Sequence, residues 1–293
     1  MAHTVGVPEL PEVHALVEFL AAKTRGRTVS EVSVIAVSVL KTYDPPIQRA
    51  QGRRVTAVHR YGKFLDLELD GLHLMVHLAR SGWLRWRPEL SPAAARPGKG
   101  PLALRLRLDD GSGFELTEAA TTKRLAVYLV RDPGDVDAVA RLGIDPLGPE
   151  FTPERFDALL TRAGRAQIKG VLRDQSVLAG IGNAYSDEVL HAALLSPFRL
   201  ACALSVGDRE RLYAAIRDVL REAVDRAVGQ AAAELKAAKR SGLRVHGRTG
   251  EACSVCGDTI RAVSFADSAL QYCPTCQTGG KPLADRRLSR LLR

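Results

Sequence analysis

The chain has 293 residues, of which 46% are hydrophobic and 26% are charged, so we expect two or three globular domains. Its 42 Lys and Arg residues outnumber its 33 Asp and Glu residues, and the resulting net charge of +9 favours a polyanion as partner. No stretch approaches 18 apolar residues and no secretory signal opens the chain, so we expect no membrane partner and a cytoplasmic location. In that reducing compartment Cys202 is expected to be a core residue.

The first half of the sequence predicts one helix followed by β-structure. Residues 13–25 carry apolar side chains at helical spacing. From residue 28 to about 130 the pattern changes to short β-type runs separated by turn signals, with a loop expected at 91–101. These features predict an all-β domain, a sandwich or a barrel, preceded by a helix. The clearest runs are Val29–Val39, Val55–His59, Phe64–Leu69, His73–Leu78 and Leu102–Leu108.

The next segment, from about residue 150 to 238, has a helical pattern. Thr152 followed by Pro153 is typical of a helix start. A second helix is expected after Val206 and runs to about Val228. Residues 231–243 are basic and poorly periodic, so we expect a linker or an exposed loop there.

Four cysteines near the C-terminus have the spacing of a metal site. Two CxxC pairs are separated by 16 residues, which is typical of a tetrahedral four-thiolate zinc site. The spacer is long enough for a β-hairpin that returns the second pair to the first. Two disulfides or a redox CxxC are the alternatives, and the missing secretory signal favours one structural Zn²⁺ ion. The predicted ligands are Cys253, Cys256, Cys273 and Cys276.

Six short segments occur in an order that is typical of one known family. They are Pro8–Val13 (PELPEV), Arg60–Phe64 (RYGKF), His77–Gly82 (HLARSG), Leu142–Leu147 (LGIDPL), Ala179–Tyr185 (AGIGNAY) and Val245–Glu251 (VHGRTGE). On these segments the chain resembles the Fpg/Nei family of DNA glycosylases/AP lyases.

The resemblance implies an α+β multidomain fold. It predicts an N-terminal β-sandwich over residues 8–130, a helix–two-turn–helix domain over 148–238, a zinc finger over 245–280 and a basic tail over 281–293. It also implies a protein that acts on damaged double-stranded DNA, and we expect a monomer that is associated with the nucleoid. The expected activity is base-excision repair by a bifunctional enzyme, which excises formamidopyrimidines or oxidised pyrimidines and then nicks the abasic site.

The chemistry of such an enzyme requires an unprotonated amine. A Schiff base forms from an amine that is free at neutral pH, and a terminal amine titrates near 7.7–8.0 whereas a lysine titrates near 10.4. The resemblance assigns this role to the nitrogen of Pro8. It also implies that Glu9 shuttles protons, that Glu12 is a supporting carboxylate and that Lys63 holds a phosphate or the leaving base.

Seven residues precede Pro8, and a proline inside a chain has an amide nitrogen in place of an amine. Our hypothesis is that translation starts at Val7 through a GUG codon, and that the initiator methionine is then removed. The alternative is a non-catalytic damaged-DNA-binding protein of the same fold. A zinc-ribbon RNA-binding protein is a third possibility.

The resemblance also implies DNA contacts. A damaged base must be flipped out of the duplex and the gap filled. The positions of the family's wedge residues here are Arg80, Lys123 and Leu125, and Leu125 is the apolar wedge. Lys169 and Asn183 are expected to contact phosphate.

The zinc finger departs from the family pattern at Ser268, where the family has an arginine. Arg261, His246, Arg248 or the basic tail are candidates for the lost contact. The segment 236–244 is also shorter than the loop that caps 8-oxoguanine in the Fpg branch of the family. The sequence therefore leaves the preferred lesion open.

Overall fold

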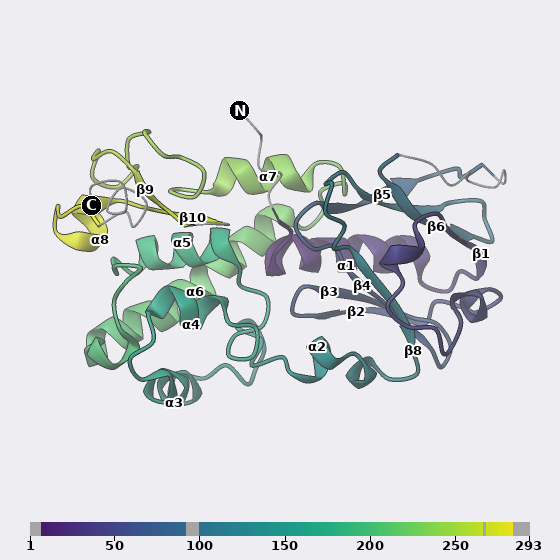
Figure 1. Cartoon of the computed structure of the whole chain (residues 1–293), viewed down its shortest axis with the longest axis horizontal. Helices are drawn as coiled ribbons and strands as arrows, with labels where there is room; N and C mark the ends of the chain where they lie inside the picture. Colours follow the sequence, from purple (N-terminus) through teal and green to yellow (C-terminus); the bar gives the residue numbers. More distant parts are fainter. Residues whose placement is uncertain (1–6, 92–99, 266–267, 284–293) are drawn as a thin grey trace. The chain divides into compact units, whose positions relative to one another are not determined.

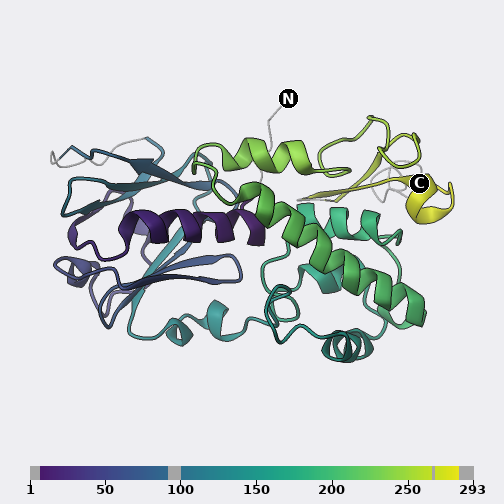
Figure 2. The ribbon, with the colours of Figure 1, turned by 180° about the vertical axis from the view of Figure 1, so that it is seen from behind.

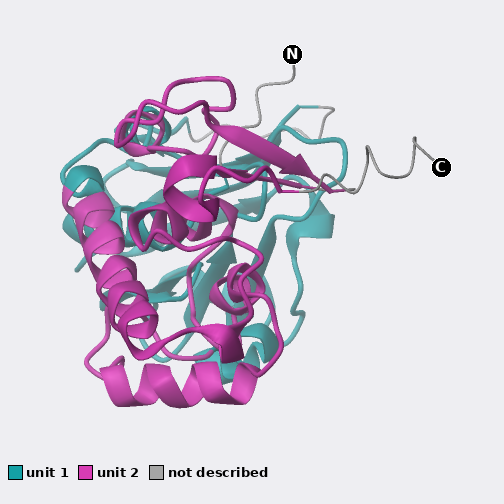
Figure 3. Cartoon of the chain, turned by 90° about the vertical axis from the view of Figure 1, so that its left-hand side faces the viewer, with its two compact units in different colours: residues 1–142, 226–238 teal, residues 143–225, 239–293 magenta. Residues whose placement is uncertain are grey.

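The computed structural model describes residues 7–91, 100–265 and 268–283, which form two compact units (Figure 3). Unit 1 contains Met1–Leu142 and Arg226–Ala238, and unit 2 contains Gly143–Asp225 and Lys239–Arg293. This division differs from the predicted segments in two ways. The zinc finger belongs to the same unit as the helical segment, and the chain returns to unit 1 after residue 225. Most of the predicted loop at 91–101 and of the basic tail lies outside the described residues.

Unit 1 is a two-sheet β-sandwich with a helix, α1 (Leu10–Thr24), at its start. Both sheets have four antiparallel strands. The 3₁₀ helices η1 (Val37–Val39), η2 (Ile47–Ala50) and η3 (Pro133–Asp135) and the short helix α2 (Asp137–Ala140) lie in its connections. One sheet has the order β1 (Val29–Val34), β6 (Leu102–Leu108), β7 (Gly113–Glu118), β5 (Gly82–Arg87), and the other β2 (Ala57–Tyr61), β3 (Phe64–Glu68), β4 (His73–His77), β8 (Ala126–Val130).

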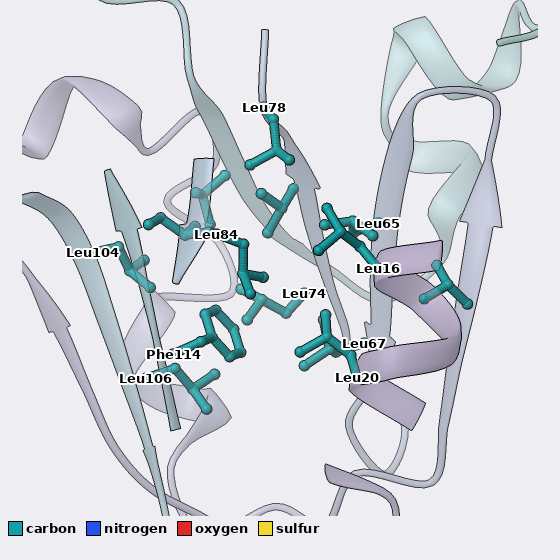
Figure 4. Close-up of a cluster of buried hydrophobic side chains, with 14 of the residues drawn as sticks. Leu16, Leu20, Leu65, Leu67, Leu74, Leu78, Leu84, Leu104, Leu106 and Phe114 are labelled. Atoms are coloured by element: carbon teal, nitrogen blue, oxygen red, sulfur yellow. The ribbon is translucent and has the colours of Figure 1, made fainter. Parts of the chain in front are cut away.

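The core of unit 1 is formed by α1 and both sheets. Leu16 and Leu20 of α1 lie beside Leu65 and Leu67 of β3, and Phe114 of β7 closes the cluster from the other sheet (Figure 4). All five side chains are fully buried. Figure 2 shows α1 alongside β2 and β3, the strands that it contacts. The apolar stripe of α1 therefore fixes the position of its N-terminus against the sandwich.

Unit 2 combines helices with a small antiparallel hairpin (Figure 1). Thr152 caps α3 by accepting a hydrogen bond from the Arg155 N–H, as its sequence predicts. The hairpin occupies the spacer between the two CxxC pairs, which confirms that prediction. The elements are α3 (Pro153–Ala163), α4 (Ile168–Arg173), α5 (Asn183–Ala192), η4 (Ala201–Ala203), α6 (Val206–Ala227, ending in unit 1), α7 (Leu235–Gly242, spanning both units), β9 (Arg261–Ser264), β10 (Ala269–Tyr272) and α8 (Pro274–Thr278).

Two sequence-based expectations are wrong. The segment 231–243 is no exposed loop, because it contains α7, and Ala232 and Leu235 are buried in the core of unit 1. The Trp83 indole N–H donates to the Ala232 carbonyl at 3.0 Å, and the Lys236 ammonium lies 4.3 Å from the ring centroid of Trp83. Cys202 is exposed, because η4 turns its neighbour Ala201 inward instead.

Within the described residues, none of the helices has the length and apolar character that a bilayer crossing requires.

Candidate active site and zinc centre

The N-terminus of α1 places three of the predicted catalytic residues next to one another. Glu9 is the N-cap residue, and its side chain accepts the N–H of Glu12. The Glu12 Oε2 atom in turn accepts the Glu9 N–H at 2.8 Å. Both carboxylates are 2% exposed, and Pro8 is buried beside them. This reciprocal capping box fixes the two side chains.

Lys63 lies at the tip of the β2–β3 hairpin, as the sequence predicts. Tyr61 pairs with Phe64, so the loop consists of Gly62 and Lys63, and Gly62 has the positive φ (54°) that such a two-residue turn needs. Burial, followed by the charge of Lys63, lowers the pKa of His77 from 6.5 to about 4. The His77 imidazole is therefore neutral near pH 7.

The loop between β4 and β5 carries Arg80, whose side chain is exposed. Ala79 has a positive φ of 53°, and Gly82 donates its N–H to the Leu78 carbonyl at 2.9 Å. A Cβ atom at Gly82 would lie 2.2 Å from the Leu78 carbonyl oxygen. Only glycine fits this turn, which holds Arg80 at the surface of unit 1.

The loop before β8 presents Lys123 but not Leu125. Lys123 is an exposed residue whose ammonium donates to the Glu118 carbonyl. Leu125 is 1% exposed and belongs to the core of unit 1, which corrects the prediction of an apolar wedge. The reason is Glu118, a buried residue that the sequence did not single out. Its Oε1 atom accepts the N–H groups of Arg124 and Leu125 at 2.7 and 3.0 Å and draws the chain inward.

In unit 2, the predicted phosphate contact Lys169 is a buried structural cation. Its Nζ atom lies 2.6 Å from Asp187 Oδ1 and 2.7 Å from Ser186 Oγ. Lys169 is 6% exposed and Asp187 is fully buried. The charge of Lys169 is thus satisfied from within the unit, because a buried ammonium requires a buried partner.

Asn183 is the first residue of α5, directly after the turn that contains Gly180 and Gly182. Gly180 has a φ of +100°, which glycine adopts without strain. The Asn183 side-chain amide donates to the Ala269 carbonyl of β10 at 2.7 Å. Its Oδ1 atom is buried without a partner among the described residues. The helix N-terminus that it opens favours an anion.

Two adjacent carboxylates on α5 bind the segment that leads into the zinc finger. Glu188 accepts the N–H groups of Arg244, Val245 and His246 at 2.7, 3.0 and 2.8 Å. Burial raises the pKa of Glu188, and those three N–H groups act in the opposite direction. Asp187 Oδ2 lies 2.7 Å from His246 Nδ1. No sequence signal singles out these two carboxylates beyond their place after the two-turn element.

The four predicted zinc ligands converge. All four Sγ atoms lie within 4.8 Å of one another, with Cys256 and Cys273 at 3.3 Å and Cys253 and Cys276 at 3.9 Å. A tetrahedral ion with Zn–S bonds of about 2.3 Å requires sulfur atoms about 3.8 Å apart. A disulfide would need about 2.05 Å, and all four cysteines are free thiols. The four sulfurs therefore fit one structural zinc ion.

The protonation behaviour of the cysteines also fits a metal. Burial raises the pKa of Cys273 to about 11, burial together with the neighbouring thiols raises that of Cys276, and a backbone hydrogen bond at Asp258 lowers that of the exposed Cys256. A bound cation would stabilise the four thiolates, which otherwise repel one another at this distance. With four sulfur ligands the ion has no open position for substrate, so its role is structural.

The finger contains Ser268 after the turn between β9 and β10, where its carbonyl accepts the Phe265 N–H at 2.7 Å. Of the candidates for the missing arginine, Arg261 is exposed on β9. His246 is held by Asp187, and Arg248 is paired with Glu251.

Family models match most of the chain. The formamidopyrimidine-DNA glycosylase N-terminal domain matches residues 7–125, and the formamidopyrimidine-DNA glycosylase H2TH domain matches residues 142–234. The zinc finger found in FPG and IleRS matches residues 250–279.

Individual relatives agree with these matches. A formamidopyrimidine-DNA glycosylase of Symbiobacterium thermophilum is 35% identical over 96% of this chain and 93% of its own length. An uncharacterized formamidopyrimidine-DNA glycosylase-like protein of Mycobacterium tuberculosis is 59% identical over 50% of this chain and 94% of its own length.

Two solved structures have the same fold. The MutM (Fpg) protein of Thermus thermophilus has a TM-score of 0.78 and 31% identity, covering 94% of this chain and all of its own. Wild-type Lactococcus lactis Fpg, in complex with DNA that contains an oxidized pyrimidine, has a TM-score of 0.80 and 26% identity, covering 92% of this chain and all of its own.

Proposed function

Because the chain belongs to the formamidopyrimidine-DNA glycosylase family, we propose that it is a bifunctional DNA glycosylase/AP lyase that acts through a Schiff base on Pro8. The observation that carries the proposal is the capping box at the start of α1. It holds two buried carboxylates beside Pro8, where the match to the family's N-terminal domain begins. A nucleophile with an adjacent proton-transfer group is the arrangement that covalent catalysis requires.

In the proposed reaction, the Pro8 nitrogen attacks C1′ of the damaged nucleotide and the glycosidic bond breaks. Glu9 supplies the proton that the leaving base or the opening sugar requires. The iminium that remains acidifies C2′, so loss of a C2′ proton expels the 3′ phosphate and cuts the strand. Glu12 holds the Glu9 backbone N–H and thereby fixes the cap. Lys63 supplies a positive charge for a phosphate or for the leaving base.

The mechanism requires Pro8 to be the first residue of the active protein. An internal proline nitrogen is an amide and has no lone pair available for attack. The proposal therefore includes a start at Val7, with removal of the initiator residue. The family match that begins at residue 7 supports this start.

The proposed substrate is damaged duplex DNA bound by a monomer. Arg80 and Lys123 are exposed cations on loops of unit 1 and suit the wedge and phosphate roles. In unit 2, Asn183 and the N-terminus of α5 suit a phosphate. The proposed lesions are formamidopyrimidines and oxidised pyrimidines, and the relative bound to oxidized-pyrimidine DNA supports this class. Such a role places the protein in the cytoplasm, at the nucleoid.

The test is base release and strand cleavage on a set of duplexes. Protein made from Val7 is incubated with duplexes that carry a formamidopyrimidine, an oxidised pyrimidine, 8-oxoguanine or no lesion. Released base and cut strand are quantified separately. We expect both products from the first two duplexes. A Glu9→Gln variant should bind the same duplexes but release base at least 100-fold more slowly, since general acid–base catalysis contributes about 10²–10⁴-fold.

The second candidate is a non-catalytic damage-binding protein of the same fold. The observation that favours it is the burial of Leu125, which leaves this position without the exposed apolar side chain that a wedge requires. Tight binding of the damaged duplexes without release of base, by the protein started at Val7, would establish this function and overturn the glycosylase.

A further inference from the structure

One buried histidine of α5 is in contact with the zinc centre. His191 is 1% exposed, and its Nε2 atom lies 3.3 Å from the Sγ atom of Cys253. Cys253 is itself 3% exposed, so water does not surround this contact. Sequence positions 191 and 253 lie far apart, and no zinc-ligand spacing includes His191.

The direction of this hydrogen bond follows from the chemistry of the ligand. A cysteine bound to zinc is a thiolate and has no proton to donate. The proton must therefore be on Nε2 of His191, which donates it to the sulfur. The Nδ1 atom is buried and has no partner within residues 7–91, 100–265 and 268–283. Within these described residues, Cys253 is the hydrogen-bond partner of the buried His191 imidazole, and buried polar groups generally have such a partner.

We propose that His191 is an outer-sphere ligand of the zinc ion, which donates its Nε2–H to the Cys253 thiolate and thereby ties the metal to α5. Partners of this kind orient a metal ligand and stabilise its negative charge. The inference goes beyond the proposed function, because it concerns how the zinc centre is held and not which base is removed.

Other contacts make α5 and the finger one cooperative part of unit 2. The Gln277 side-chain amide, on α8 directly after the last ligand Cys276, donates to the Leu195 carbonyl just after α5 at 2.9 Å. The Asn183 amide at the other end of α5 donates to Ala269 of the hairpin. Since coupling between two sites is reciprocal, zinc should order α5 and an intact α5 should retain zinc. Binding of zinc should therefore also stabilise the N-terminus of α5, which is proposed to bind phosphate.

The test compares two substitutions that differ in one hydrogen-bond donor. His191→Gln keeps an N–H near the position of Nε2, and His191→Leu fills a similar volume without a donor. Val189→Ala, on the same helix and fully buried, is the control for a general loss of packing in α5. Zinc affinity is measured on the full-length, zinc-loaded proteins by competition with a chromophoric chelator. We expect the leucine variant to bind zinc about 10-fold or more weakly. The glutamine variant and the control should stay within about 3-fold of the wild type.

A second readout separates a hydrogen bond from mere filling of space. Co²⁺ replaces Zn²⁺ in each protein, and the sulfur-to-cobalt charge-transfer bands are recorded. Loss of the donor should shift these bands in the leucine variant, and the glutamine variant and Val189→Ala should retain the wild-type spectrum. Wild-type affinity and spectrum in the leucine variant would overturn the proposal. Equal weakening in the leucine and glutamine variants would overturn it too, because the position would then need only the shape of histidine.

Discussion

The predicted site residues of the two units are held in different ways. In unit 1, Glu9 and Glu12 cap one helix turn and Lys63 is at the tip of a two-residue hairpin, so their partners are close in sequence. In unit 2, Asp187 and Glu188 bind groups that are 18 to 84 residues away. The proposed catalytic residues therefore depend on local structure, whereas the proposed DNA-binding helix depends on buried long-range contacts and on zinc.

Removal of zinc should have the largest effect and should be confined to unit 2. Binding of a structural zinc provides about 10–16 kcal/mol of free energy, and without the ion no disulfide joins the four sulfur atoms, which lie within 4.8 Å of one another. After chelation, hydrogen exchange should become fast in β9, β10 and α5, and stay slow in the two sheets of unit 1. DNA binding should weaken, and the start of α1 should stay intact. Loss of protection in β3 and β4 would show that the units are not independent.

The next largest effect is expected from Lys169→Met, which leaves Asp187 charged and buried without its cation. Breaking a buried pair in this way costs about 3–5 kcal/mol, measured here by urea denaturation of the zinc-loaded protein. Arg248→Met breaks an exposed pair with Glu251 and should cost under about 1 kcal/mol.

The same variant tests whether Lys169 contacts DNA. If Lys169 is structural, the salt dependence of duplex binding should be unchanged in Lys169→Met. A slope reduced by about one, with unfolding unaffected, would restore the phosphate contact that the sequence suggested.

Glu188→Ala should destabilise unit 2 by about 1–3 kcal/mol, because it leaves the buried N–H of Val245 without an acceptor, whereas the partly buried N–H groups of Arg244 and His246 can turn to water. The control Glu222→Ala removes an exposed partner of Arg244 and should cost under about 1 kcal/mol. The midpoint of thermal unfolding is the measurement. Equal midpoints for the two variants would mean that the backbone of residues 244–246 finds other partners.

The smallest effect is expected at a local contact of unit 2, the start of α6. The Ser205 N–H donates to Asp208 Oδ2 at 3.0 Å, and this bond is the main cause of a lowered Asp208 pKa. A carboxyl whose pKa is lower in the folded state stabilises the fold above its unfolded pKa, and the contribution is lost as pH falls through the folded value. Between pH 6 and pH 3 the wild type should therefore lose more free energy of unfolding than Asp208→Asn does. The difference between the two losses should be about 1 kcal/mol or less. If the free energy of unfolding depends on pH in the same way in the wild type and in Asp208→Asn, the proposed contribution of the Ser205–Asp208 hydrogen bond is contradicted.

The features that the sequence predicted correctly are those that depend on local sequence patterns. Short sequence patterns predicted four features that the structure contains. They are the helix at residues 13–25, the Lys63 hairpin, the Thr152 cap and the four zinc ligands. The helix, the hairpin and the cap depend on residues a few positions apart, and the zinc ligands form two CxxC pairs with a recognisable spacing, so periodicity and spacing detect them.

The features that sequence reasoning missed depend on tertiary contacts. Lys169 looks like a surface cation until Asp187 is placed beside it, and Leu125 looks like a free wedge until Glu118 draws its backbone inward. The segment 231–243 is basic and poorly periodic in sequence, yet the hydrogen bond from Trp83 to Ala232 ties its first part to unit 1. His191 has no ligand spacing at all, so its contact with Cys253 could not be found without the fold.

The most direct test of the central claim is the residue that forms the Schiff base. Protein made from Val7 is mixed with a duplex that carries one abasic site, reduced with borohydride, digested and mapped by mass. We predict a covalent adduct on Pro8 as the first residue of its peptide. An adduct on a lysine such as Lys63, or no adduct despite tight binding of the duplex, would contradict the proposed mechanism.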